Sequence, residues 1–165
     1  MKVLLLTGPG GDAQGWGDMS VTKSVADAAA AAGHPARIAF VETEQDFLRT
    51  IDEGGFDIVW SALYYITPNE KFIGRGEGGM WVADVLDSRG IPYVGSGVLA
   101  SAVCMDKVAS KAILAAHDIP QVKSCLVTRH AFTKSPEAAL APCRELAPPW
   151  FVKPANLGSS VGVSK

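Results

Sequence analysis

Residues 151–165, FVKPANLGSSVGVSK, bring a lysine together with a loop of small residues. The apolar residues before Lys153 are typical of a short buried strand, and Pro154 ends it because proline cannot donate a ladder hydrogen bond. Successive N–H groups in the loop that follows can converge on an anion, and Lys153 can supply a cation for phosphate oxygens. The segment predicts a phosphate-binding loop; the alternative is a solvated lysine before an ordinary hairpin loop.

A second glycine-rich segment, TGPGGDAQG, follows the first apolar run of the chain. Gly8, Gly10 and Ala13 have the spacing of a dinucleotide-binding fingerprint, and Glu42 is a candidate acceptor for a ribose hydroxyl. In that fingerprint the helix begins at once, whereas here further glycines prolong the loop. A substrate-binding or lid loop is therefore favoured, with a NAD site or a structural turn as the alternatives.

Apolar runs alternate with helical patterns over the first 95 residues, which is typical of a parallel sheet covered by helices. Thr43 is the expected N-cap of the second helix. The resulting order βαβαβαβ predicts a Rossmann-like α/β domain. The expected strands are 2–7, 36–41, 56–63 and 91–95, and the expected helices are 20–33, 43–55 and 80–90.

After this domain the alternation of apolar runs and helical patterns gives way to one long helical pattern. Residues 96–120 are helical in pattern, and Pro120 ends the run. Strands are expected at 122–128 and 149–154, with a helix at 135–146 between them. We therefore expect three parts, in which residues 1–95 form an α/β substrate-binding domain, 96–120 a connecting helix and 121–165 the start of another domain.

Composition limits the classes of function. The chain has 165 residues, of which 48% are hydrophobic, and a net charge of −2, which argues against nucleic-acid or membrane-surface partners. No stretch approaches the roughly 20 apolar residues that a membrane helix requires. Cys104, Cys125 and Cys143 are odd in number and far apart, so reduced thiols in a cytoplasmic protein are expected.

Two blocks of residues carry a resemblance to a known family. Residues 90–111, GIPYVGSGVLASAVCMDKVASK, contain a strand that enters a GSG turn, then a helix with MDK and a following SK. Residues 152–165, VKPANLGSSVGVSK, contain a VKP strand that leads into a GSSVG loop. In this order and separation the blocks resemble the D-alanyl-D-alanine ligases of the ATP-grasp superfamily. The resemblance implies a pre-ATP-grasp domain followed by the beginning of an ATP-grasp domain.

The resemblance also assigns roles to the residues of both blocks. It implies that Lys107 and Lys153 contact ATP, and that the loop from Gly158 to Val161, which includes Ser160, closes over the transferred phosphoryl group. Ser159 would be a catalytic residue that also holds the first amino acid. Positioned cations and N–H donors are what phosphoryl transfer requires. Mg²⁺ is implied as well, with its ligands expected beyond residue 165 and no metal site within this chain.

The chain departs from the family where amino-acid substrates are recognised. The first loop usually has a glutamate before a serine that resembles Ser20, and here only Asp18 keeps a carboxylate. Tyr64 stands in the place of a histidine at the end of the third strand, whereas Glu77 survives in the loop that follows. Asp18, also a candidate catalytic residue, and Ser20, Tyr64 and Glu77 are therefore the candidate substrate-binding residues.

The resemblance predicts a cytoplasmic, homodimeric, ATP-dependent ligase of cell-wall peptidoglycan synthesis that joins two amino acids through an acyl phosphate. Three alternatives remain: an ATP-grasp ligase of other amino-acid specificity, a NAD-binding Rossmann enzyme and a non-catalytic ligand-binding domain. We expect the 165 residues to be a fragment or the ordered part of a longer chain, and to be inactive alone.

Overall fold

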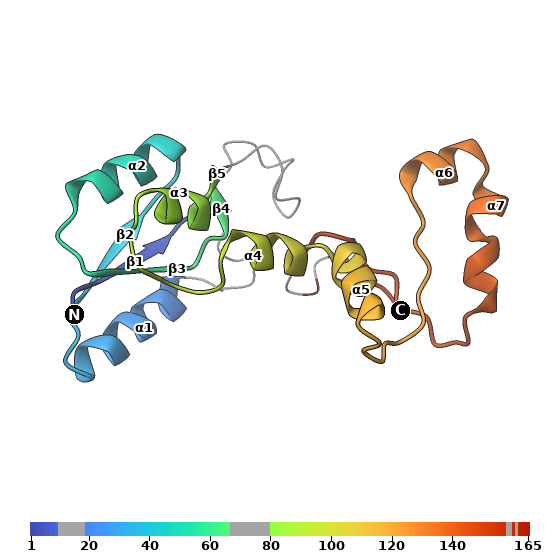
Figure 1. Cartoon of the computed structure of the whole chain (residues 1–165), viewed down its shortest axis with the longest axis horizontal. Helices are drawn as coiled ribbons and strands as arrows, with labels where there is room; N and C mark the ends of the chain where they lie inside the picture. The colour runs from blue at the N-terminus through green and yellow to red at the C-terminus, as the bar shows by residue number, and fades with distance from the viewer. Residues whose placement is uncertain (10–18, 67–79, 158–159, 161) are drawn as a thin grey trace.

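A computed structural model describes residues 1–9, 19–66, 80–157, 160 and 162–165, and Figure 1 shows the arrangement of their elements. Four parallel strands form one sheet in the order β2-β1-β3-β6. This finding confirms the α/β class with a parallel sheet. The strands are β1 (Val3–Thr7), β2 (Ala36–Phe40), β3 (Ile58–Ser61) and β6 (Tyr93–Val94).

Helices cover both faces of this sheet. Figure 1 shows α1 (Met19–Ala31) on one side, with α2 (Glu44–Glu53) and α3 (Val82–Ser88) on the other. Successive side chains of a strand point to opposite faces, so β1 contributes to both layers and all its residues are buried. The main core lies between the sheet and the second helical layer, and includes Leu4, Leu6, Val59, Phe47, Ile51, Val82 and Leu86.

The predicted cap of α2 is confirmed. The hydroxyl of Thr43 accepts a hydrogen bond from the backbone N–H of Asp46 at 3.1 Å, and the Asp46 carboxylate accepts one from the Thr43 N–H at 3.2 Å. This reciprocal pair satisfies N–H groups that have no partner within the helix. One turn apart, Phe47 and Ile51 are buried against the sheet. Local capping and apolar spacing therefore fix α2 in place.

A short antiparallel pair precedes α3. Strands β4 (Tyr65–Ile66) and β5 (Met80–Trp81) pair with each other, and the ring centroids of Tyr65 and Trp81 lie 5.7 Å apart. The helix expected at 80–90 consequently begins two residues later, at Val82.

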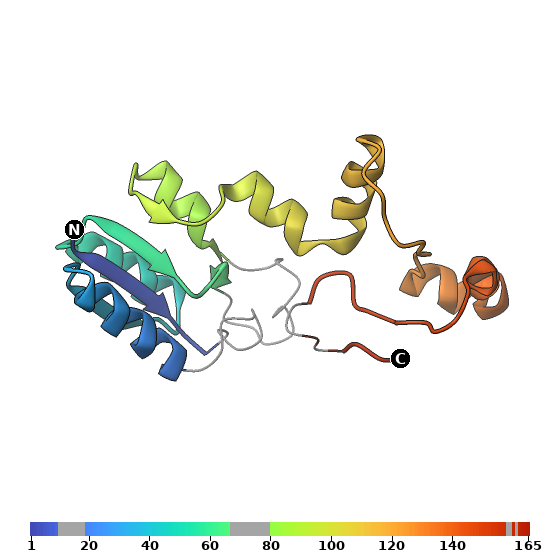
Figure 2. The same ribbon diagram turned by 90° about the horizontal axis from the view of Figure 1, so that it is seen from below.

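The expected helix at 96–120 is divided into α4 (Val98–Met105) and α5 (Lys107–Ala116). Asp106 lies between them in an extended conformation, with φ −102° and ψ 111°. Figures 1 and 2 show these helices leading away from the sheet toward the remaining helical elements. Those elements are α6 (Arg129–Lys134), α7 (Pro136–Leu140) and the 3-10 turn η2 (Ala141–Glu145).

The strands expected at 122–128 and 149–154 are wrong. Residues 122–128 form no strand, and only Val152 of the second segment pairs, through a single antiparallel bridge to Ser164. A strand needs a neighbour to complete its ladder. The exposed fraction of Val122 is 86% and that of Leu126 is 59%, so this segment is not covered by a neighbouring layer.

The expectation of reduced thiols is also wrong for two of the cysteines. The structure joins Cys125 and Cys143 in a disulfide, whereas Cys104 is free and exposed. The intervening helical elements turn the chain back, so that the two Cα atoms lie 5.8 Å apart, within the range a disulfide requires. Spacing along the sequence did not reveal this proximity.

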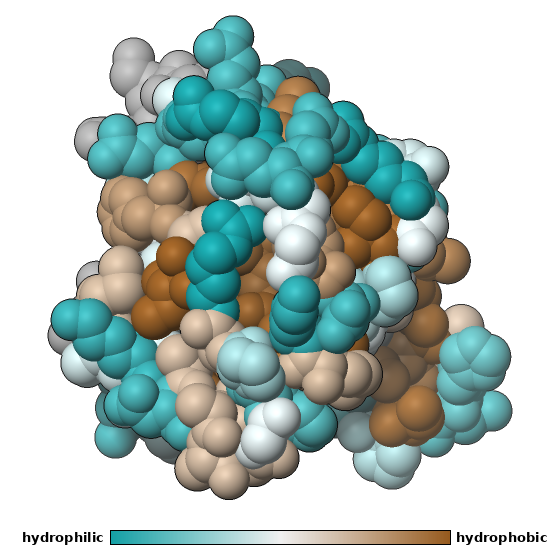
Figure 3. Space-filling view, turned by 90° about the vertical axis from the view of Figure 1, so that its left-hand side faces the viewer, coloured by the Kyte–Doolittle hydropathy of each residue, from teal (hydrophilic) through white to brown (hydrophobic). Residues whose placement is uncertain are grey.

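The buried core is confined to the sheet domain. Every buried residue in the described part of the chain lies before residue 87. Figure 3 views the end of the molecule that carries the sheet, where apolar residues show between polar side chains. By contrast, α4, α5, α6 and α7 bury none of their described residues. The positions of these later elements therefore depend on polar contacts more than on a core.

Within the described ranges, no helix combines the length and the hydropathy needed to cross a bilayer.

Candidate active site

The corner where α4 meets α5 is organised by Asp106. Its Oδ1 accepts hydrogen bonds from the N–H groups of Val108 at 2.7 Å and Ala109 at 2.9 Å, which caps α5. The N–H of Ala109 is the main cause that holds the pKa of Asp106 below its ordinary 3.8, and Val108, Asn156 and nearby Lys107 lower it further against the opposing effect of burial. The carboxylate is therefore charged at neutral pH.

This corner also binds the segment that precedes the glycine-serine loop. The backbone N–H of Lys107 donates to the carbonyl of Ala155 at 3.0 Å, and its Nζ donates to the carbonyls of Leu157 at 2.6 Å and Ala155 at 3.3 Å. The side-chain amide of Asn156 donates to Oδ2 of Asp106 at 3.1 Å. Two motifs about fifty residues apart in sequence therefore form one structural unit.

Lys107 thus has a structural partner that its sequence position did not reveal. An ammonium group has three donors, and its two bonds to the loop carbonyls use two of them. One donor remains for a further acceptor such as a phosphate oxygen. The side chain can therefore hold residues 155–157 and contact an anion at the same time. Its contact with ATP stays a prediction.

A hairpin-like pairing closes the base of the glycine-serine loop. Val152 N–H donates to Ser164 O at 2.9 Å, and Ser164 N–H donates to Val152 O at 3.0 Å. Lys153 follows directly and is exposed, so its ammonium is accessible to a ligand. Ser160 has a positive φ of 60°, and its carbonyl accepts from the N–H of Val163 at 3.2 Å. The described part of the loop is therefore tightly turned.

Gly162 is required by this turn. Its φ is +70°, a conformation that residues with a Cβ rarely adopt. A Cβ at this position would also lie 2.8 Å from Cγ of Pro154, which is closer than real Cβ atoms approach. Gly158, Ser159 and Val161 lie outside the described residues, so their predicted roles stay predictions.

A second part of the candidate site lies beside the carboxyl ends of β3 and β6, the edge at which open α/β sheets bind ligands. Here Tyr64, 48% exposed, lines a small cavity together with Tyr93 and Ser96. Burial raises the pKa of Tyr93 above its ordinary 10.0, and Asp87 adds to this effect, so the phenol keeps its proton at neutral pH. Tyr64 therefore lines a cavity at this edge, and its role in substrate recognition stays a prediction.

The other predicted residues of the first loop are only partly described. Ser20 lies in the first turn of α1 and is exposed. Asp18 and Glu77 lie outside the described residues. Their predicted contacts with an amino-acid substrate therefore stay predictions.

Gly8 has a packing role that weakens the dinucleotide interpretation. A Cβ on Gly8 would lie 2.3 Å from the carbonyl oxygen of Val41, a backbone atom that cannot easily move away. The glycine is therefore explained by close packing at the end of β1, without a phosphate. Gly10 and Ala13 lie outside the described residues.

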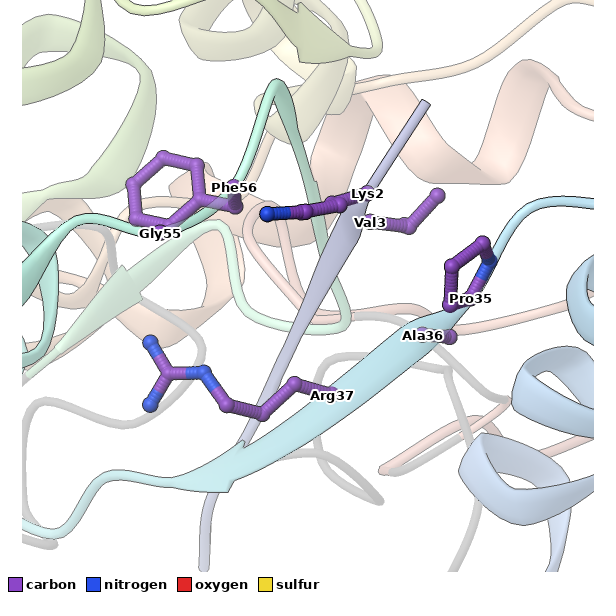
Figure 4. A pocket seen from close by; sticks show the side chains of 7 residues that line it. All are labelled: Lys2, Val3, Pro35, Ala36, Arg37, Gly55 and Phe56. Carbon is purple, nitrogen blue, oxygen red and sulfur yellow. The ribbon is translucent and has the colours of Figure 1, made fainter.

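A larger hollow of about 170 Å³ lies at the opposite edge of the sheet. Figure 4 shows that Lys2 and Arg37 contribute cationic side chains to its lining. Arg37 also forms an ion pair with Glu53 at 3.5 Å. Because this hollow lies at the amino ends of the strands, it is away from the edge where such sheets bind ligands.

In the part of the chain that the structure describes, no group of three or more His, Cys, Asp or Glu side chains is placed to hold a metal ion.

Solved structures define the class of this fold. The D-alanine–D-alanine ligase from Bacillus anthracis matches 99% of this chain and 48% of its own, with a TM-score of 0.57 and 22% identity. D-alanyl-alanine synthetase A from Vibrio cholerae matches 99% of this chain and 52% of its own, with a TM-score of 0.52 and 22% identity. The chain therefore shares its fold with about half of each of these two structures.

Sequence comparison also finds D-alanine–D-alanine ligases. Residues 113–165 match the family described as D-ala D-ala ligase C-terminus. The D-alanine–D-alanine ligase of Deinococcus radiodurans is 53% identical over 90 residues, which cover 54% of this chain and 26% of that protein. That of Geobacillus thermodenitrificans is 44% identical over 115 residues, which cover 69% of this chain and 29% of that protein.

These matches confirm the resemblance to the D-alanine–D-alanine ligases that the two motif blocks predict. The chain spans between a quarter and a third of the length of these curated relatives.

Sequence reasoning missed the roles of Asp106 and Asn156. An Asp directly before a helix start is a recognised N-cap signal, but the pattern of residues 96–120 suggested one continuous helix. Asn156 gave no local signal, because its partner lies fifty residues away.

Proposed function

We propose that the chain supplies the substrate-binding domain and the start of the ATP-grasp domain of an ATP-dependent carboxylate–amine ligase, which joins two amino acids as the D-alanine–D-alanine ligases do. One observation carries this proposal. The MDK corner and the segment before the glycine-serine loop, which are the two blocks of the resemblance, are held together by hydrogen bonds from Lys107 and Asn156. The Lys107 ammonium thus lies beside the segment that leads into the small-residue loop, and phosphate recognition uses cations and N–H donors of this kind.

In the proposed reaction, a carboxylate oxygen of the first amino acid attacks the γ-phosphorus of ATP, and ADP leaves. The amine of the second amino acid then attacks the acyl carbon, loses a proton, and releases inorganic phosphate as the peptide bond forms. Lys107 and Lys153 would neutralise phosphate charge, and N–H groups of the loop would bind the transferred oxygens. Ser159 would hold the first amino acid together with Asp18, Ser20, Tyr64 and Glu77.

Magnesium offsets phosphate charge in reactions of this class. The described residues offer no cluster of ligands for it, so no step above is assigned to a metal and no residue of this chain is assigned to one.

The remaining proposals concern the whole protein. We place the domain boundaries near residues 95 and 120, at either side of the segment that contains α4 and α5. We also propose a homodimeric cytoplasmic enzyme of peptidoglycan synthesis, because the curated relatives are D-alanine–D-alanine ligases and the reaction consumes ATP. Nucleic acid and membrane surfaces are not proposed partners, since the net charge of −2 provides no basic field.

A ligase of different amino-acid specificity is the second candidate. Tyr64 replaces the histidine of the family pattern and lines the cavity beside β3 and β6. A phenol differs from an imidazole in size and in charge, so the pocket wall can select another side chain.

The proposal is tested by ADP release from the protein expressed from its native reading frame, with ATP and a panel of D- and L-amino acids. Release that requires both ATP and an amino acid is expected. Release without an amino acid contradicts the ligase, and binding of NADH without ATP turnover favours a Rossmann oxidoreductase.

A further inference from the structure

Residues 155–157 differ from their surroundings in burial. All three are part-buried, although most described residues after Ser96 are exposed. They lie against the first turn of α5, where Lys107 binds two of their carbonyl oxygens. Asn156 is the residue whose side chain completes this contact.

The Asp106 carboxylate performs two tasks with separate oxygens. Oδ1 caps α5, and Oδ2 accepts the Asn156 amide at 3.1 Å. A charged acceptor forms a stronger hydrogen bond than a neutral one. The same carboxylate that begins the helix therefore fixes the chain two residues before Gly158.

We propose that Asp106 and Asn156 are positioning residues, which form a latch that holds residues 155–157 on α5 and so sets the geometry of the phosphate-binding loop. This inference rests on the proposed function. Neither side chain needs to touch ATP or an amino acid. The latch acts by keeping Lys107 of α5 and Lys153, which precedes residues 155–157, in a fixed relation.

The latch should affect the chemical step more than substrate binding. Lys107 and Lys153 remain present when the latch is broken, so most of the attraction for ATP is kept. The loop that would contact the transferred phosphoryl group becomes less well placed, and such a contact matters most in the transition state. A lower kcat with little change in the KM for ATP is the expected signature.

Three variants of the protein expressed from its native reading frame separate the Asp106–Asn156 hydrogen bond from the cap of α5. Asp106→Ser keeps a good N-cap, but its short side chain cannot cap α5 and reach Asn156 together. Asn156→Ala removes the donor alone. The exchanged pair, Asp106→Asn with Asn156→Asp, rebuilds the hydrogen bond with its polarity reversed. Thr128→Ala, which removes the cap of α6, is the control for a purely structural loss.

Each single latch variant is expected to lower kcat about tenfold, the value of one hydrogen bond to a charged group. The double variant Asp106→Ser with Asn156→Ala should be no slower than either single variant, because the two residues share one interaction. The exchanged pair should recover most of the lost kcat, and Thr128→Ala should have the kcat of the wild type.

Additive losses in the double variant, or an exchanged pair as slow as the single variants, would overturn the latch. A second readout, the NMR signal of the Asn156 side-chain amide, should shift in Asp106→Ser and stay in place in Thr128→Ala. An unshifted signal in Asp106→Ser overturns the inference even if the enzyme is active. A wild-type protein that releases no ADP contradicts the proposed function, while the NMR signal still tests the latch.

Discussion

Replacing Lys107 with methionine removes its ammonium and keeps the length of its stem. In the structure this ammonium binds the carbonyls of Leu157 at 2.6 Å and Ala155 at 3.3 Å. A hydrogen bond from a charged group contributes about 1.5–3 kcal/mol, and water can replace part of it here because the segment is only part-buried. The lower end, about 1.5 kcal/mol, corresponds to roughly tenfold in the opening equilibrium of the segment.

Hydrogen exchange of the backbone amide of residue 107, corrected for its intrinsic rate, measures this opening, because this N–H donates to the carbonyl of Ala155 at 3.0 Å. Exchange about tenfold faster is expected in Lys107→Met. The matched control is Lys153→Met, which removes an exposed ammonium and should change exchange by less than about twofold. Equal exchange rates in the two variants would refute the structural role assigned to Lys107.

Three further predictions concern other parts of the molecule. Gly8→Ala should destabilise the sheet domain by about 1–3 kcal/mol in thermal unfolding, because its Cβ meets the Val41 carbonyl, whereas Gly97→Ala, whose Cβ would lie 4.0 Å from the Tyr93 hydroxyl, should cost less. The fold lowers the pKa of Asp106, so the stabilisation from its carboxylate is complete above the unfolded pKa of 3.8 and is lost as the pH falls through the lower pKa of the folded state. The NMR signal of the Asn156 amide should show this loss, and a signal that stays constant to strongly acidic pH would contradict it. Tyr64→His should shift activity in the amino-acid panel toward D-alanine, and an unchanged preference would remove Tyr64 from substrate selection.

The four strands of the parallel sheet and the helices that cover it could be predicted from the sequence, whereas the β4–β5 pair was missed. The predicted elements carry their own signals, such as the Thr43 cap and the apolar run of β1, and each is reinforced by burial in one core. Local preference and tertiary environment agree there, so residue patterns were sufficient to predict these elements.

The later half of the chain could not be predicted in the same way. The apolar residues around Val122 and Leu126 have strand-like character, but they lack a neighbouring strand and stay exposed. The Cys125–Cys143 bond and the Asn156–Asp106 contact join residues that are distant in sequence, and no local pattern specifies such partners.

The chemical roles predicted for the candidate site stay predictions, and its geometry could not be predicted. The motif blocks predicted the resemblance to the D-alanine–D-alanine ligases that the comparisons confirm, and Lys107 was selected because that resemblance assigns it to ATP. Its contacts with Ala155 and Leu157 depend on how two distant segments meet, which only the fold reveals.

A protein made only of residues 1–165 provides a further test. Apolar side chains such as Phe151 and Val152 are 58% and 67% exposed, so the described residues of the later half form no core of their own. We expect the isolated chain to keep a folded sheet domain and to release no ADP. Amino-acid-dependent ADP release by these residues alone would contradict that expectation.

The central claim is that the MDK corner and the glycine-serine loop form the ATP-phosphate site of an amino-acid ligase. It is tested most directly by ADP release from the native-frame protein as ATP is varied at saturating amino acid, for the wild type and for Lys153→Met. The account predicts release that depends on the amino acid, with a KM for ATP raised about tenfold or more in the variant. Release that needs no amino acid, or identical ATP kinetics in the two proteins, would contradict it.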